Sequence, residues 1–210
     1  MVPQPTRLPG TIRLVSSVHR LDVATTLRAV TSGHDPALLA ELAAVAGPMT
    51  APTGIFTPAG LAQLLANTRR YGAAGRFTVA GDGRWYAGLD LDVAEAERGH
   101  HLMREYRRDR AMPGAVASLD PYQAHVQASG CCLRGAPPYD QRLILSPDDY
   151  APGQALGAEM MRRGDPLLRY PSVRRPGGEC VVVFADHALE SVQLLPPRTA
   201  RWTGEGLEWS

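Results

Sequence analysis

Four polar residues stand in otherwise apolar surroundings, and their chemical types could serve one reaction. They are Arg76 in AAGRFTV, Tyr86 in RWYAGL, Glu97 in DVAEAERGHH and Ser172 in RYPSVRRPGG. A carboxylate can stabilise positive charge that develops on a sugar carbon, and an arginine can hold phosphate oxygens with two parallel N–H donors. Taken singly, each residue also fits an ordinary structural role in a strand, core, surface or turn. The four together are the candidate catalytic and substrate-binding set.

The common signatures of other chemistries are absent. The chain has no GxxxxGK[ST], no GxGxxG after a strand and no GxSxG, and Gly81-Asp82-Gly83 is the length of a turn. His100 and His101 are adjacent in a helical pattern, where neighbours point about 100° apart. We therefore expect one buried and one exposed histidine, and no metal or cofactor.

Composition indicates one ordinary globular domain. The 210 residues are 44% hydrophobic and 20% charged with a formal net charge of +1, which favours no nucleic-acid binding. No apolar run approaches the roughly 20 residues of a membrane span. The odd set Cys131, Cys132 and Cys180 lacks a CxxC motif and indicates reduced thiols. With no apolar segment near the first residue, the expected location is the cytoplasm.

Periodicity and punctuation predict a mixed order of elements. Residues 1–10 hold three prolines and are expected to form a flexible arm, followed by the domain over 11–210. Predicted helices cover 36–46, 58–67, a segment from Asp90 or Asp92 to about Arg107, and 154–163 before Gly164. Predicted strands cover 11–16, 75–79, 84–89, 122–128, 142–145, 167–171, 179–184, 190–195 and 199–202, with a hairpin-type turn at 80–83, a link at 48–54 and a polar loop at 146–153. The expected class is α+β, a single domain with about four helices.

Two separated blocks of this chain resemble the RES-domain family. The first is GRFTVAGDGRWYAGLDLDVAEAERGHH, in which Arg76 precedes Tyr86 by ten residues and Tyr86 precedes Glu97 by eleven. The second is QALGAEMMRRGDPLLRYPSVRRPGGECVVVF, which contains Ser172. IRLVSS near the start and PPRTARW near the end are also similar to the family. The resemblance covers nearly the whole chain.

The resemblance implies a fold, an activity and a partner. The implied fold is similar to ADP-ribosyltransferases, with NAD⁺ held between split mixed β-sheets. The implied activity is NAD⁺ consumption by a toxin of a toxin–antitoxin pair, with water or phosphate as acceptor. NAD⁺ is then a substrate, and no cofactor is required. The implied partner is an antitoxin with an Xre-type helix-turn-helix domain, in a complex that contains a toxin homodimer.

Three hypotheses remain open at this stage. The first is NAD⁺ degradation, by a glycohydrolase or a phosphorylase. The second is ADP-ribosylation of a protein or nucleic acid, because Glu95-Ala96-Glu97 looks like the Glu-x-Glu of arginine-modifying transferases. In a helix those two glutamates diverge by about 200°, so we expect Glu97 in the pocket and Glu95 on the far side beside Arg98 and Asp92. The third is an inactive module that only binds the antitoxin, but none of the four candidate residues is lost.

Overall fold

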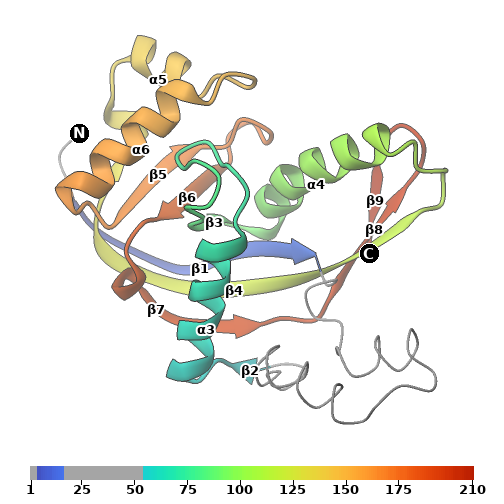
Figure 1. Cartoon of the computed structure of the whole chain (residues 1–210), viewed down its shortest axis with the longest axis horizontal. Helices are drawn as coiled ribbons and strands as arrows, with labels where there is room; N and C mark the ends of the chain where they lie inside the picture. The colour runs from blue at the N-terminus through green and yellow to red at the C-terminus, as the bar shows by residue number, and fades with distance from the viewer. Residues whose placement is uncertain (1–3, 17–53) are drawn as a thin grey trace.

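The structure is a computed structural model that describes residues 4–16 and 54–210. The predicted helix over 36–46 and most of the link over 48–54 lie outside the described residues. Two long antiparallel strands, β1 (Gln4–Ser16) and β4 (Val116–Cys132), run side by side through the middle of the molecule (Figure 1). They include the predicted strands over 11–16 and 122–128, which are confirmed and are longer than expected.

The first part of β1 corrects the expectation of a flexible arm over residues 1–10. Residues 4–8 pair with 126–130 of β4, whereas residues 1–3 lie outside the described part. The prolines are compatible with a strand here because this stretch of β1 is hydrogen-bonded on one side only, and a proline at such an edge removes no ladder bond. The register shifts between Leu8 and Thr11, at Pro9-Gly10.

Nine strands of the described residues form one mixed, hydrogen-bonded sheet. From β1 the pairing continues to β3 (Trp85–Gly88), β6 (Glu179–Val183) and β5 (Leu167–Pro171), and β5 pairs in turn with β4. β4 also pairs with β7 (Leu189–Leu194), which pairs with β2 (Gly54–Ile55). At one end β4 also pairs with β8 (Arg198–Trp202), which pairs with β9 (Leu207–Trp209). Only β4 and β5 are parallel. The predicted strands over 84–89, 167–171, 179–184, 190–195 and 199–202 are confirmed, and β9 was missed.

Four α-helices occur within the described residues. They are α3 (Pro58–Tyr71), α4 (Leu91–Arg108), α5 (Pro138–Ile144) and α6 (Ala151–Arg163). The helices predicted to begin at Pro58, after Asp90 and near Gln154 are confirmed, and so is the α+β class. None of the four has the length and apolarity that crossing a bilayer requires.

The predicted strand over 142–145 is wrong, because these residues end α5 and its following turn. The apolar run RLIL is too short for its period to distinguish a strand from a helix. Pro138 stands at the first helical position, where its missing N–H costs nothing, and it starts the helix instead. The polar loop predicted over 146–153 ends at Tyr150, where α6 begins.

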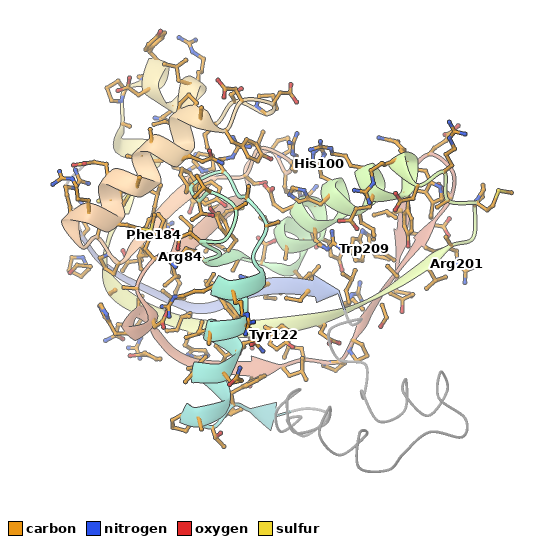
Figure 2. The ribbon with its side chains drawn as sticks, viewed as in Figure 1. Arg84, His100, Tyr122, Phe184, Arg201 and Trp209 are labelled. Carbon is orange, nitrogen blue, oxygen red and sulfur yellow. The ribbon has the colours of Figure 1, made fainter. Side chains whose placement is uncertain are left out.

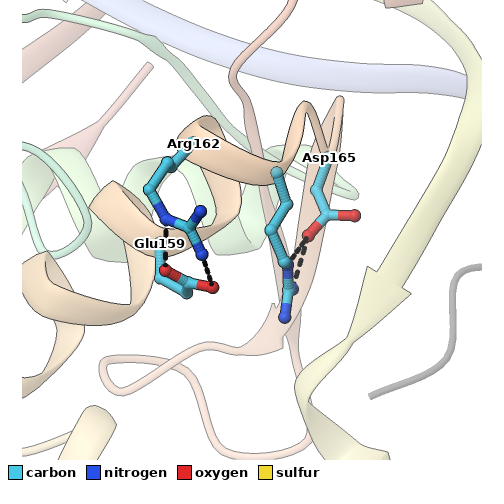
Figure 3. Close-up of polar contacts among 4 residues, drawn as sticks. Glu159, Arg162 and Asp165 are labelled. Carbon is cyan, nitrogen blue, oxygen red and sulfur yellow. Dashed lines mark hydrogen bonds and ion pairs between the residues drawn. The ribbon is translucent and has the colours of Figure 1, made fainter.

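The end of α6 follows the predicted punctuation. Gly164 adopts a left-handed conformation with φ of 77°, which stops the helix. Two ion pairs lie there (Figure 3): Glu159–Arg162 at 2.8 Å, with both side chains exposed, and Arg163–Asp165 at 2.5 Å, with the Asp165 side chain half-buried. Exposed pairs of this kind contribute little to stability.

The core lies on both faces of β5 and β6. Leu167 and Val181 pack with Trp85 on one face, together with Leu65 of α3. The alternate residues of the same strands pack on the other face with Phe77 and Met160 of α6. Strands buried on both faces contain continuous apolar runs, which explains the sequence VVVF at 181–184.

Candidate functional site

Glu97 is placed by a short connection from β3 into α4. The Asp90 side chain caps α4 by accepting a hydrogen bond of 2.8 Å from the Val93 amide. Gly88, the last residue of β3, lies so close to the helix that a Cβ atom there would be 2.6 Å from the Ala94 amide nitrogen. The first turn of α4 therefore sits directly on the end of β3, and Glu97 follows within the next turn.

The far side of α4 is held by the C-terminal strands. A Cβ atom on Gly99 would lie 3.3 Å from the Trp209 ring, so the helix packs closely against β9. Figure 2 shows Trp209 beneath the helix and His100 on its outer side. His100 is half-buried and His101 is exposed, and burial lowers the pKa of both imidazoles. No group of three metal-ligating side chains occurs in residues 4–16 and 54–210.

Ser172 fixes one oxygen of the Glu97 carboxylate. The Ser172 hydroxyl accepts hydrogen bonds from the amides of Arg174 (3.2 Å) and Arg175 (2.9 Å). Its own proton is thereby directed to Glu97 Oε1, which lies 2.6 Å from Ser172 Oγ. Hydrogen bonds to a charged acceptor are about twice as strong as neutral ones. Ser172 is therefore positioned to orient Glu97.

The Cys180 thiol is a second hydrogen-bond donor to Glu97 Oε1. The Cys180 thiol, which is 2% exposed, lies 3.7 Å from Glu97 Oε1. Burial and the neighbouring Glu97 carboxylate raise the pKa of this thiol, so it stays protonated and remains a donor. Sequence reasoning used Cys180 only to infer a reduced compartment. Among the described residues no hydrogen bond reaches Glu97 Oε2, which leaves that oxygen for a ligand.

Arg76 lies in a tight turn, so the strand predicted over 75–79 is wrong. The turn is closed by a hydrogen bond of 2.9 Å from the Gly75 amide to the Thr78 carbonyl. The Gln154 side chain of α6 donates to both of these residues' carbonyl oxygens, at 3.1 and 3.3 Å. Since the turn depends on a helix more than seventy residues away, local alternation could not reveal it. Residues 80–83 still turn, but they do not join a hairpin.

Two glycines allow α6 to approach this turn. A Cβ atom on Gly153 would lie 2.4 Å from the Arg76 carbonyl oxygen, and one on Gly157 would lie 2.0 Å from that of Phe77. Any side chain at either position would displace the turn. The Gly-x-x-x-Gly spacing of α6 thus allows the helix backbone to pack against the segment that contains Arg76.

Arg76 is 9% exposed as a residue, and protein groups occupy part of its guanidinium. Its Nη1 atom donates to the carbonyls of Ile144 and Ser146, and its Cζ lies 4.8 Å from the centre of the Tyr150 ring. These contacts fix its orientation. Nε and Nη2 have no hydrogen bond to the described residues, so two donors remain for a phosphate or ribose oxygen.

The Tyr86 hydroxyl supports the same turn. It accepts a hydrogen bond of 2.9 Å from the Phe77 amide and lies 3.1 Å from Thr78 Oγ1. Burial raises the pKa of Tyr86 to about 12, so the phenol is neutral. The hydroxyl is thus committed to the turn, whereas the ring lines the pocket and can stack on a ligand.

Arg13 of β1 is a pocket residue that sequence reasoning missed. Its Nη1 donates to the Arg84 carbonyl at 2.9 Å, and its guanidinium lies 5.2 Å from the centre of the Trp85 ring. No carboxylate of the described residues pairs with it, and burial lowers its pKa to about 10. Arg13 is half-buried, and an anionic ligand would offset the cost of withdrawing its charge from water. The available signal was a charged residue within the apolar run IRLV.

Glu95 lies away from Glu97, but not beside the expected neighbours. Its Oε1 forms an ion pair of 2.9 Å with Arg198 of β8, and its side chain is 14% exposed. Arg98 instead pairs with Glu105, and Asp92 pairs with Arg175. The expected surface ion pair of Glu95 with its helix neighbours is therefore wrong, because Glu95 is mostly buried and pairs with β8, whereas the divergence of the two glutamates is as the helical geometry requires.

A cavity of about 380 Å³ brings the candidate residues together. Its walls include Arg13, Arg76, Tyr86, Glu97, Tyr170 and Cys180. Ser172 is not in the wall but contacts Glu97 from behind. The cavity has the size of a small-molecule site, and it combines a fixed carboxylate, buried cations and an aromatic ring. A second cavity of about 450 Å³, lined by Arg7, Cys132 and Arg169, contains none of the four candidate residues.

Comparison with known proteins assigns the chain to one family. A search of curated proteins found no match. The family model described as the RES domain matches residues 51–203, which include every candidate residue of the pocket except Arg13. Two sequence blocks with the family's spacing and a pocket that joins them agree with this match, and the chain belongs to the RES-domain family.

Proposed function

We propose that this protein cleaves the nicotinamide–ribose bond of NAD⁺ and serves as the toxin of a toxin–antitoxin pair. RES domains are associated in general with NAD-degrading toxins of such systems. The observation that carries the proposal is the Glu97 carboxylate, which lies in the cavity with one oxygen fixed by Ser172 at 2.6 Å and the other unoccupied by described residues.

The chemistry needs a fixed negative charge and no general acid. The nicotinamide of NAD⁺ is cationic, so when the C–N bond breaks its electron pair stays on the ring nitrogen and a neutral ring leaves. Positive charge then develops on C1 of the ribose and its ring oxygen. Glu97 Oε2 stabilises this charge, and the acceptor oxygen forms the new bond to C1 and loses a proton. Preorganised charges of this kind contribute on the order of 3–4 kcal/mol.

The remaining pocket residues bind the substrate. Arg13 and the free Nε and Nη2 donors of Arg76 hold the pyrophosphate oxygens. The Tyr86 ring stacks on the nicotinamide. Ser172 and Cys180 orient Glu97 through its other oxygen, Oε1. These interactions hold the dinucleotide with its reactive carbon beside Glu97.

Incubation of the purified protein with NAD⁺ tests the proposal. With water as acceptor the products are nicotinamide and ADP-ribose, and with phosphate they are nicotinamide and phosphorylated ADP-ribose. Chromatography with and without added phosphate separates the glycohydrolase from the phosphorylase. Intact NAD⁺ after prolonged incubation contradicts the proposal.

The alternative is transfer of ADP-ribose to a macromolecule. In arginine-modifying transferases the first glutamate of Glu-x-Glu activates the acceptor, whereas here Glu95 is paired with Arg198 and is not part of the cavity. This arrangement favours NAD⁺ degradation. Labelled NAD⁺ added to a lysate distinguishes the two, because label on protein or nucleic acid supports the transferase.

The proposed partner is an Xre-type helix-turn-helix antitoxin that silences the pocket. RES-domain toxins typically pair with an antitoxin. Arg13, which has no carboxylate partner among residues 4–16 and 54–210, and the partly free Arg76 attract a carboxylate, such as a chain terminus, into the cavity. We expect an assembly with at least two toxin copies whose NAD⁺ turnover is blocked. A complex that turns over NAD⁺ as fast as the free toxin contradicts this mode of inhibition.

A further inference from the structure

We propose that the Arg98–Glu105 ion pair of α4 forms the adenosine-ribose subsite and makes the protein selective for NAD⁺ over NADP⁺. This inference rests on the proposed function, because it assumes that the cavity binds a nicotinamide dinucleotide. The two coenzymes differ only by a phosphate on the 2′-oxygen of the adenosine ribose. Selectivity must therefore come from groups at that position.

One face of α4 lines the cavity from its inner to its outer end. Ala94, Glu97, His101 and Glu105 recur at intervals of three or four residues and all belong to the cavity wall. Ala94 is 4% exposed, whereas the Glu105 side chain is 44% exposed. Because the reacting ribose lies at the inner end beside Glu97, the rest of the dinucleotide extends outward along this face.

The spacing along the helix fits the length of the ligand. Glu97 and Glu105 are eight residues apart, which corresponds to about 12 Å along an α-helix. This span carries a ligand from the nicotinamide ribose across the pyrophosphate to the adenosine ribose. The second ribose thus reaches Glu105.

The ion pair suits a ribose and disfavours a phosphate. Arg98 extends over two helical turns and contacts both carboxylate oxygens of Glu105, at 3.1 and 3.3 Å. A carboxylate at this place accepts hydrogen bonds from ribose hydroxyls, as in other NAD-binding sites, and repels a 2′-phosphate. While Glu105 is bound to Arg98 Nη1 and Nη2, its carboxylate neutralises the positive charge that a 2′-phosphate would need. The pKa of His101 between them is lowered by partial desolvation in the cavity wall and by Arg98, which disfavours a positive charge there.

The test compares turnover of the two coenzymes by the full-length protein. Glu105→Gln removes the repelling charge and releases Arg98, so we expect the ratio of kcat/KM for NADP⁺ over NAD⁺ to rise about tenfold or more. Arg98→Gln as a single substitution should lower the ratio of kcat/KM for NADP⁺ over NAD⁺ below its wild-type value. The matched control is Glu159→Gln on α6, which breaks an equally bidentate Glu–Arg pair outside the cavity and should leave the ratio unchanged.

A binding measurement separates failure of this inference from failure of the proposed function. Calorimetry with ADP-ribose and with its 2′-phosphate reports the subsite without any bond cleavage. Wild type should prefer ADP-ribose, and Glu105→Gln should lose this preference. Equal use of both coenzymes by wild type, or an unchanged ratio in Glu105→Gln, overturns the inference and leaves NAD⁺ cleavage intact. If wild type turns over neither coenzyme but still binds ADP-ribose more tightly than its 2′-phosphate, the proposed function is overturned and the subsite is retained.

Discussion

Glu97 and Glu95 lie on the same helix, α4, and replacing each in turn by glutamine removes its negative charge. The two variants should separate an effect on catalysis from an effect on stability. In Glu97→Gln the amide oxygen can still accept from the Ser172 hydroxyl, which lies 2.6 Å from Oε1, so the fold should be retained. The charge facing the ribose is lost, however. Removal of one preorganised stabilising group costs about 2.7–4 kcal/mol in the transition state, so we expect kcat to fall about 100- to 1,000-fold.

Glu95→Gln should have the opposite profile. The variant breaks the 2.9 Å pair with Arg198, whose side chain is 31% exposed against 14% for Glu95. A partly buried pair of this kind is worth about 1–2 kcal/mol, between the exposed and the fully buried cases. For a domain of this size that loss lowers Tm by about 2–8 °C. NAD⁺ turnover below the melting range should stay within about threefold of wild type.

Steady-state kinetics and thermal melts on both purified variants decide the matter. Wild type, Glu97→Gln and Glu95→Gln should show three different combinations of activity and Tm. If Glu95→Gln is the inactive variant, the reasoning from the Ser172 contact is refuted and the transferase alternative gains. If Glu97→Gln retains full turnover, no fixed charge at Glu97 is needed and the mechanism fails.

Three further variants test the other parts of the pocket. Tyr86→Phe leaves the buried Phe77 amide without its acceptor, so the free energy of unfolding should fall by about 1–3 kcal/mol, as measured by urea denaturation. The KM for NAD⁺ in steady-state kinetics should rise, because the turn that contains Arg76 loosens. Arg13→Met should raise KM for NAD⁺ at least about tenfold while Tm does not fall, because the variant removes a half-buried cation that pairs with no carboxylate of the described residues. An unchanged affinity for ADP-ribose in calorimetry speaks against its role. The pKa of Cys180 is raised from an ordinary value near 9, so the unfolded chain loses this proton first and stability falls as pH rises above about 9, by about 1.4 kcal/mol per pH unit. Urea denaturation at pH 8 to 10 should show a shallower decline for Cys180→Ala than for wild type, and identical slopes count against the burial of a neutral thiol.

The amino-acid sequence by itself determined helix ends and the family, because both depend on patterns within short stretches of the chain. Asp90 and Gly164 mark where α4 begins and α6 ends, because caps act within one turn of a helix. The family and the spacing of Arg76, Tyr86 and Glu97 could also be found from sequence, since a pattern of residue types is a property of the chain itself.

Tertiary structure decided what those residues contact. Residues 75–79 have the alternation of a strand, yet Gln154 of α6, more than seventy residues away, stabilises a turn there. The same turn engages the hydroxyl of Tyr86, a residue that sequence reasoning placed in the candidate catalytic and substrate-binding set. Long-range hydrogen bonds and close backbone approach outweigh local preference, because propensity differences between strand and turn are within about 1 kcal/mol per residue.

The composition of the pocket wall was decided in the same way. Arg13 joins Glu97 because β1 pairs with β3 at Ile12 and Gly88, a contact between segments about seventy-five residues apart. Cys180 reaches Glu97 because β6 pairs with β3 on the other side. Sequence spacing cannot show which strands become neighbours. The pairing partners of a strand depend on how the whole sheet buries its two faces. Local pattern thus specifies the start of α4, the end of α6 and the family, whereas the pocket is assembled only through the order of strands in the sheet.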